Sequence, residues 1–278
     1  MILKSCSKIN LSLKINKKLA SGLHNIQSFF CLINLHDRIK IKKIKEKRDI
    51  IKFRGKFAKY VSKKKNTIFD TLRILRKANT INSYYSVEIN KKIPVFAGLG
   101  GGTSNAASLI KYLTEKKIKK KLASELEKKI GTDLKIFDHN QGFLKNIKTI
   151  NDFKKKYSLF FLLIYPNFKS STKYVYSKVR KYSKNFNYNF SKLNNKKRLI
   201  KVLINNGNDL QSIVEKKHPI IEKLITEIQL HKGCYFSRMT GSGSVCYGMF
   251  KNEKAAKVAL TKIKLKYPKF WFSVAKTI

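Results

Sequence analysis

The feature that most constrains the fold is a run of glycines followed by a helix pattern. Residues 94–107 read PVFAGLGGGTSNAA, with four glycines within positions 98–102. Glycine lets the backbone turn several N–H groups toward one point, because no Cβ stands in the way. A helix that begins here would direct its positive dipole end and its unpaired N–H groups to the same place. The segment therefore predicts a phosphate-binding loop at the start of a helix, which we expect to run from Ser104 onward.

Two common phosphate-binding patterns do not describe this loop. No lysine follows the glycines as it does in a Walker A loop. The glycines can be aligned with the dinucleotide-binding fingerprint, but no strand–helix–strand context precedes them. A flexible linker is the alternative, and the strand pattern before the loop and the helix pattern after it favour an ordered site.

A second glycine loop occurs near the end of the chain. Residues 239–250 read MTGSGSVCYGMF and lie between two strand patterns. Alone, this segment is equally consistent with a tight hairpin. Together, the two loops are suited to holding both ends of a phosphate chain.

Strand and helix patterns alternate along the rest of the sequence. We expect strands at 7–15, 26–35, 37–44, 50–57, 83–94 and 159–165, and helices from 67, at 122–131, at 172–182 and at several places after 198. Asn66 is a suitable N-cap for the first helix. The patterns predict a mixed α/β (α+β) fold with two layers in each half, divided into domains 1–150 and 151–278.

The sequence is strongly basic, with 62 Lys and Arg against 16 Asp and Glu, a formal charge of +46. All but eight of the basic residues are lysines, and they are spread over the whole chain. Proteins that read nucleic acids favour arginine for bidentate contacts. We therefore attribute the charge mainly to A/T-rich codon usage and expect no specific nucleic acid, although a basic nucleic-acid-binding protein remains an alternative. Either way, the charge attracts phosphorylated ligands.

The cysteines and the apolar runs indicate the cellular compartment in which such a chain would function. Cys6, Cys31, Cys234 and Cys246 form no CxxC pair, which argues against a zinc site or a disulfide framework. The longest apolar run, 159–165, is too short to span a bilayer, and the N-terminus lacks the apolar region of a secretion signal. We expect a cytoplasmic protein with no membrane partner.

Three motifs resemble, in the expected order, those of the GHMP small-molecule kinases. They are SKINLSLKI at 7–15, the glycine loop at 94–107 and the second loop at 239–250. With GLH at 22–24, the first motif is most similar to the branch that acts on a cytidine-diphosphate-linked methylerythritol. Lesser matches are Gly131-Thr-Asp133, Ser171-Thr172 and Asn208-Asp209-Leu210. The resemblance covers essentially the whole chain. It implies the GHMP kinase fold: an N-terminal ATP-binding domain, a C-terminal ferredoxin-like domain and an active site in the cleft between them.

The resemblance also implies a reaction, the ATP-dependent phosphorylation of the 2-hydroxyl of 4-diphosphocytidyl-2-C-methyl-D-erythritol in non-mevalonate isoprenoid precursor synthesis. Asp133 would be the general base and Lys8 its partner. These residue types suit the reaction, because a carboxylate accepts the hydroxyl proton and a nearby lysine keeps that carboxylate ionised. Mg²⁺ is implied with ATP, and Ser104 is its predicted ligand.

The remaining site residues are carried over from the motifs. For ATP they are Asn66, Pro94, Ala97, Gly98, Leu99, Gly100, Gly101, Gly102, Thr103, Ser104 and Asn105. For the substrate they are Asn10, His24, Thr172, Tyr176, Gly241, Ser242 and Gly243, with His24 at the cytosine and Tyr176 at the position of an aromatic residue. The family usually has a tyrosine just before the histidine, where this sequence has Leu23. Another GHMP activity, such as homoserine or mevalonate kinase, remains open, and we expect a monomer or homodimer.

Overall fold

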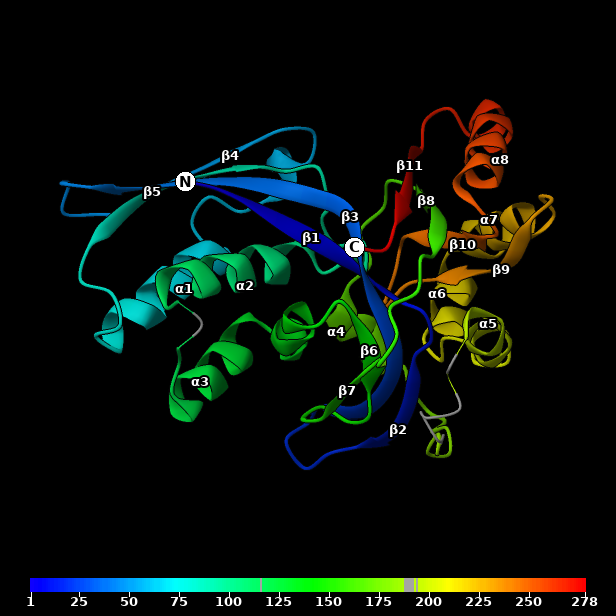
Figure 1. The fold of residues 1–278 in the computed structure, drawn as a ribbon, viewed down its shortest axis with the longest axis horizontal. Helices are drawn as coiled ribbons and strands as arrows, with labels where there is room; N and C mark the ends of the chain where they lie inside the picture. Colours follow the sequence, from blue (N-terminus) through cyan, green and yellow to red (C-terminus); the bar gives the residue numbers. More distant parts are fainter. Residues whose placement is uncertain (116, 188–192, 194) are drawn as a thin grey trace. The chain divides into compact units, whose positions relative to one another are not determined.

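The computed structural model describes residues 1–278 except 116, 188–192 and 194, and it divides into two compact units (Figure 1). Unit 1 comprises Met1–Ser7, Leu35–Val95 and Gly100–Asp138, and unit 2 comprises Lys8–Asn34, Phe96–Leu99 and His139–Ile278. Each unit gathers segments that are distant in the sequence. The family-domain boundary at residue 150 stays a prediction.

A seven-stranded sheet is organised around one long strand. Its order is β4-β5-β3-β6-β7, and β1 and β2 also pair with β3. The strands are β1 (Ile2–Asn10), β2 (Lys14–Lys18), β3 (His24–Ile44), β4 (Ile50–Arg54), β5 (Tyr84–Asn90), β6 (Gln141–Leu144) and β7 (Ile150–Asp152). β4 lies at the edge and pairs in parallel with β5, whereas β3 pairs antiparallel with β2, β5 and β6.

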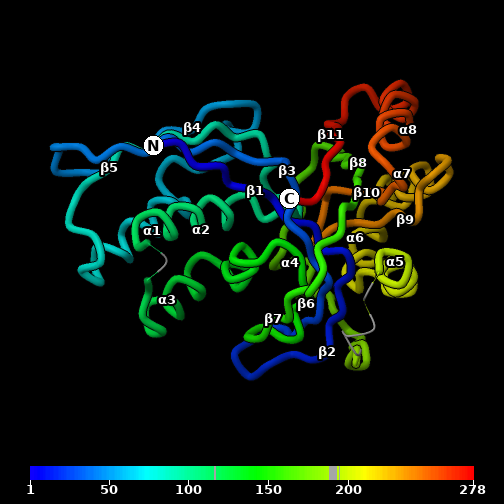
Figure 2. The backbone as a smooth tube through the Cα atoms, in the orientation of Figure 1, coloured from blue at the N-terminus to red at the C-terminus, as the bar shows by residue number. Residues whose placement is uncertain are grey.

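β3 is continuous where the sequence predicted two strands, 26–35 and 37–44, and Figure 2 shows its uninterrupted course. The predicted break fell beside Asp37, whose carboxylate is fully buried. Its Oδ1 accepts hydrogen bonds from the backbone N–H groups of Lys92 at 2.7 Å and Ile93 at 2.9 Å. Since these donors compensate the buried charge, the strand continues through it. Conversely, the single strand predicted at 7–15 was wrong, because β1 ends at Asn10 and β2 begins at Lys14.

The described residues of unit 1 also form helices. They are α1 (Thr67–Lys77), α2 (Gly101–Leu113) and α3 (Lys120–Ile130), with the short 3₁₀ helices η1 (Ala58–Tyr60) and η2 (Thr132–Asp138). Both predicted helix boundaries near Asn66 and Gly131 are confirmed. Asn66 Oδ1 accepts from Phe69 N at 3.0 Å, and Gly131 follows α3 as its C-cap.

Unit 2 contains a four-stranded antiparallel sheet of order β11-β8-β10-β9. The strands are β8 (Phe160–Tyr165), β9 (Cys234–Met239), β10 (Cys246–Phe250) and β11 (Trp271–Lys276). The helices are α4 (Thr172–Ser177), α5 (Lys196–Ile204), α6 (Gln211–Lys217), α7 (Ile220–Gln229) and α8 (Glu253–Lys266), of which α7 and α8 pack against the sheet. The predicted buried strand is confirmed, because the side chains from Phe161 to Ile164 are fully buried in β8. Among the described residues, no helix has the length and apolar character needed to cross a membrane.

Candidate functional site

The glycine loop enters α2 three residues earlier than the sequence predicted. α2 begins at Gly101, with Gly100 as a left-handed N-cap at φ 69°. Glycines are tolerated here because the first helical turn leaves its N–H groups free of intrahelical partners. A Cβ on Gly101 would lie 2.9 Å from the side chain of Ile93, so only glycine fits this close approach. The first turn of α2 thus offers free N–H groups and a dipole to an anion, as a phosphate site requires.

A buried ion pair lies beneath this first turn. Lys91, 3% exposed, donates from Nζ to the fully buried carboxylate of Asp37 and, at 2.9 Å, to Asn105 Oδ1. Asn105 Nδ2 donates to Asp37 at 3.0 Å and to Ser5 Oγ at 2.9 Å. Burial lowers the pKa of the Lys91 ammonium, and the charge of Asp37 opposes that shift. The network fixes the first turn of α2 to β1, to β3 and to the segment after β5.

The side chains of Ser104 and Asn105 are therefore occupied by the protein. Ser104 Oγ donates to the Cys6 carbonyl at 2.6 Å and lies 2.7 Å from Ser5 Oγ. Both side chains are almost completely buried. As an ATP-binding residue, Asn105 would contribute through its backbone. Ser104 stays the predicted Mg²⁺ ligand, a role that would require its hydroxyl to leave these partners.

Two further segments meet the first turns of α2 in unit 1. Thr67 Oγ1, at the start of α1, donates to the Gly102 carbonyl at 2.9 Å. A Cβ on Gly131, at the start of the Gly-Thr-Asp turn, would lie 3.8 Å from Thr103 Oγ1. Unit 1 thus brings together the N-terminus of α1, the glycine loop and the turn that carries Asp133.

The turn of Asp133 is held by α2 and α3. Lys111 of α2 donates from Nζ to the Phe137 carbonyl and pairs with Asp138 at 3.0 Å. Lys135 pairs with Glu127 of α3 at 3.6 Å. The carboxylate of Asp133 is half-buried, and the same helix that carries the glycine loop therefore helps to position it.

In unit 2, the two glycine loops pack directly against each other. Gly98 has φ +78°, and a Cβ there would lie 2.2 Å from the Thr240 carbonyl oxygen. Val245 N donates to the Ala97 carbonyl at 3.2 Å. The interpretation of 239–250 as a hairpin is confirmed, because β9 and β10 pair antiparallel on either side of the loop. The hairpin loop also packs against Ala97–Leu99.

The first motif joins the same contact region of unit 2. Asn10 N donates to Thr240 Oγ1 at 3.0 Å, and Lys8 N donates to the Leu99 carbonyl at 3.1 Å. Lys8 is buried and its ammonium donates to Asn10 Oδ1. Thr172 Oγ1 lies 2.8 Å from Ser242 Oγ. All three motifs therefore meet in this unit.

His24, at the start of β3 in unit 2, lies near Tyr176 of α4. Its ring centroid is 5.2 Å from that of Tyr176, with the planes tilted by 39°. Burial, and then the positive charge of Lys18, lower the pKa of the His24 imidazole. The ring is therefore neutral at pH 7, with one nitrogen free to accept a hydrogen bond.

The predicted site residues divide between the units. Unit 1 holds Asn66, Pro94, Gly100, Gly101, Gly102, Thr103, Ser104, Asn105 and Asp133, and unit 2 holds Lys8, Asn10, His24, Ala97, Gly98, Leu99, Thr172, Tyr176, Gly241, Ser242 and Gly243. Sequence reasoning missed Lys91 and Asp37. Lys91 carries no signal among so many lysines, whereas Asp37 could have been noticed as a carboxylate inside an apolar strand pattern.

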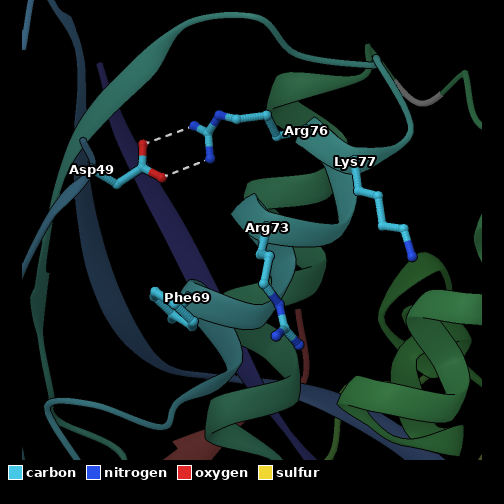
Figure 3. A pocket seen from close by; sticks show the side chains of 5 residues that line it. All are labelled: Asp49, Phe69, Arg73, Arg76 and Lys77. Carbon is cyan, nitrogen blue, oxygen red and sulfur yellow. Dashed lines mark hydrogen bonds and ion pairs between the residues drawn. The ribbon is translucent and has the colours of Figure 1, made fainter. Parts of the chain in front are cut away.

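A hollow of about 350 Å³ is lined by Asp49, Phe69, Arg73, Arg76 and Lys77, whose side chains are drawn in Figure 3. The two arginines already have partners, because Arg76 pairs with Asp49 at 3.0 Å and Arg73 with Asp70 at 3.1 Å. None of the predicted site residues lines this hollow. The hollow is therefore separate from the predicted site residues.

Comparison with known families defines the class of protein. The GHMP kinases N terminal domain model matches residues 66–138, and the GHMP kinases C terminal model matches residues 190–269. The resemblance read from the motifs is confirmed: the class is that of the GHMP kinases.

Comparison with individual proteins indicates the particular family within the GHMP kinases. The chain is 38% identical to a 4-diphosphocytidyl-2-C-methyl-D-erythritol kinase of Pelagibacter ubique (strain HTCC1062), over 99% of this chain and 98% of that protein. It is 32% identical to the kinase of the same name from Wolbachia sp. subsp. Brugia malayi (strain TRS), with the same coverage. The chain belongs to this family of kinases.

Solved structures agree on the fold. A crystal structure of 4-(cytidine 5'-diphospho)-2C-methyl-D-erythritol kinase superposes with a TM-score of 0.74 at 18% identity, covering 99% of both chains. The Methanococcus jannaschii mevalonate kinase superposes with a TM-score of 0.64, also at 18% identity, covering 100% of this chain and 98% of that one. The predicted GHMP kinase fold is confirmed.

Proposed function

We propose that this kinase transfers the γ-phosphoryl group of ATP to the 2-hydroxyl of 4-diphosphocytidyl-2-C-methyl-D-erythritol, a step toward isoprenoid precursors by the non-mevalonate route. The substrate follows from the names of relatives that cover nearly the whole chain. One observation supports the chemistry most directly. The turn that carries Asp133 lies against the first turn of α2, where Gly131 approaches Thr103.

The glycine loop fits the phosphates of ATP. A Cβ would collide with neighbouring atoms at Gly98 and at Gly101, so the loop can pack this closely only because both residues are glycine. The N–H groups of the first turn of α2 bind the phosphate oxygens, and Thr67 fixes the end of α1 to this turn. ATP would supply the transferred group, and Mg²⁺, when bound, would neutralise charge on its phosphates. Mg²⁺ keeps several waters and needs few protein ligands, which is compatible with one hydroxyl such as that of Ser104.

Asp133 acts as the general base. Its carboxylate accepts the proton of the substrate hydroxyl as that oxygen attacks phosphorus, which spares the formation of a free alkoxide. Lys8 contributes positive charge to the same step, and its hydrogen bond to Asn10 fixes its ammonium. Asn10 and Thr172 hold the substrate, and His24 and Tyr176 contact its base. Since the four cysteines are unpaired, we place the activity in a reducing compartment, the cytoplasm.

Two alternatives are separated by experiment. A panel of cytidyl substrate, homoserine and mevalonate, each with labelled ATP and Mg²⁺, tests which product acquires the label. We expect label in the cytidyl product alone. Label in homoserine or mevalonate instead would reverse the assignment. Binding to nucleic acid that persists at physiological salt and depends on sequence would favour the nucleic-acid alternative, whereas nonspecific binding by lysines fades with salt.

A further inference from the structure

Three aromatic rings gather at His24 in unit 2, and we refer to His24, Tyr176 and Tyr182 as the ring cluster. The centroid of Tyr182 is 6.4 Å from that of His24, with the planes tilted by 32°, which complements the 5.2 Å pair of His24 and Tyr176. Tyr182 is 48% exposed. The cluster therefore presents an aromatic surface of tilted rings that the described part of the chain does not fully cover.

Tyr182 lies outside any helix or strand, but its position is fixed through the next residue. Ser183 N donates to the Ile15 carbonyl at 2.8 Å, and Ser183 Oγ donates to Asp209 Oδ2 at 2.8 Å. Asn16 Nδ2 donates to the Ser183 carbonyl at 3.2 Å. Asp209 also accepts from Ile15 N at 2.7 Å, so β2 and Asp209 hold the segment together. Several hydrogen bonds therefore hold the segment that places an exposed tyrosine beside His24.

The residue before His24 offers no ring. Leu23 is aliphatic and 45% exposed, so aromatic contact at this place comes from the neighbours of His24. Nucleic-acid bases stack on aromatic side chains irrespective of hydrogen-bonding pattern, because every base has a π face. An exposed, positioned tyrosine next to a histidine is suited to such a base.

We propose that Tyr182 is a specificity-determining residue, whose ring supplies a stacking face for the pyrimidine base of the substrate. This inference rests on the proposed function, since it names a further contact to the same substrate. Stacking by Tyr182 compensates for the missing aromatic residue at position 23. This stacking needs the aromatic ring of Tyr182 and not its phenolic hydroxyl.

The test compares Tyr182→Ala, Tyr182→Phe and the wild type in steady-state kinetics. Tyr182→Ala should raise the KM for the cytidyl substrate by about 5- to 100-fold, as expected when a stacked base loses its ring. The KM for ATP and the melting temperature should not change. Tyr182→Phe should stay close to the wild type because the ring remains. Tyr235→Ala, at a comparably exposed tyrosine on β9, serves as the matched control and should change neither KM.

Two kinetic results would overturn the inference: an unchanged substrate KM in Tyr182→Ala, or a Tyr182→Phe variant as impaired as Tyr182→Ala. Calorimetric titration with CDP separates this inference from the proposed function. If the wild type does not phosphorylate the cytidyl substrate, the proposed function fails. CDP binding that weakens in Tyr182→Ala would still support the ring's role, whereas equal binding in both proteins, or none in either, would refute it.

Discussion

The first turn of α2 lies on a buried set of hydrogen bonds, whereas the ring cluster is partly exposed, and the segment of Tyr182 is held through neighbouring residues of the chain. At α2, Lys91, Asp37 and Asn105 satisfy one another in the interior of unit 1. In the ring cluster, the segment of Tyr182 is held by hydrogen bonds of the residues that follow it, Ser183 and Lys184. The difference suggests a division of labour. The region that we propose binds phosphate is held by buried hydrogen bonds, whereas the region that we propose contacts a base would tolerate the exchange of one aromatic residue for another.

The largest effect should come from the reacting group. Asp133→Asn should lower kcat by about 10²- to 10⁴-fold, because the substrate hydroxyl loses its proton acceptor. The KM for ATP should change little, since the phosphates bind to the glycine loop. Asp152→Asn, at an exposed carboxylate paired with His139 in unit 2, is the control and should keep wild-type turnover. Near-normal turnover in Asp133→Asn would remove the general base from the account.

Next in size is the loss of the buried ion pair. Lys91→Met should lower the free energy of unfolding by about 3–5 kcal/mol, because Asp37 is left charged and buried without its cation. Lys91→Met/Asp37→Asn should recover much of that loss, since neither charge remains and Asn keeps an acceptor for the backbone. Urea denaturation measures both. Lys266→Met removes an exposed pair with Glu227 and should be indistinguishable from the wild type. Equal losses in the single and double variants would mean that the charge pair is not what fixes α2.

A smaller effect is expected at the contact between the glycine loops. Gly98→Ala places a Cβ 2.2 Å from the Thr240 carbonyl at a positive φ, which should cost about 1–3 kcal/mol of stability and raise the KM for ATP. Gly207→Ala is the matched control, because a Cβ there meets nothing within 4 Å. Thermal melts and ATP titrations of the two variants make the comparison. Identical behaviour would show that the loops do not depend on this close contact.

The smallest effect is a pH dependence at the ring cluster. Because the pKa of His24 is lowered from its ordinary value of 6.5, the imidazole becomes protonated only at more acidic pH. The KM for the cytidyl substrate should therefore be flat around neutrality and rise in acid, as His24 loses its acceptor nitrogen. Lys18→Met removes a positive neighbour, raises the pKa and should move this rise to higher pH. A pH profile unaffected by Lys18→Met would count against a role for neutral His24.

Much of the fold followed from local sequence signals. The N-cap at Asn66, the helix end at Gly131 and the buried strand β8 are confirmed because each depends on neighbouring residues alone. The continuity of β3 could not be predicted, since the donors that satisfy Asp37 lie at Lys92 and Ile93, far along the chain.

The candidate site, like the fold, could be predicted from the sequence only in part. The glycine motif predicted an anion-binding loop, but the start of α2 at Gly101 depends on a left-handed Gly100 that no periodicity reveals. The ion pair beneath α2 joins Asp37 to Lys91 across 54 positions, so the spacing of residues along the sequence did not predict it. The ion pair therefore depends on contacts between segments far apart in the sequence, which local propensity does not reveal.

The most direct test of the central claim is ADP release by the purified protein with ATP and Mg²⁺, with and without 4-diphosphocytidyl-2-C-methyl-D-erythritol. The account predicts release that depends on this substrate and that Asp133→Asn lowers by about 10²- to 10⁴-fold. Folded protein that releases no ADP with this substrate, but does so with homoserine or mevalonate, would contradict the account.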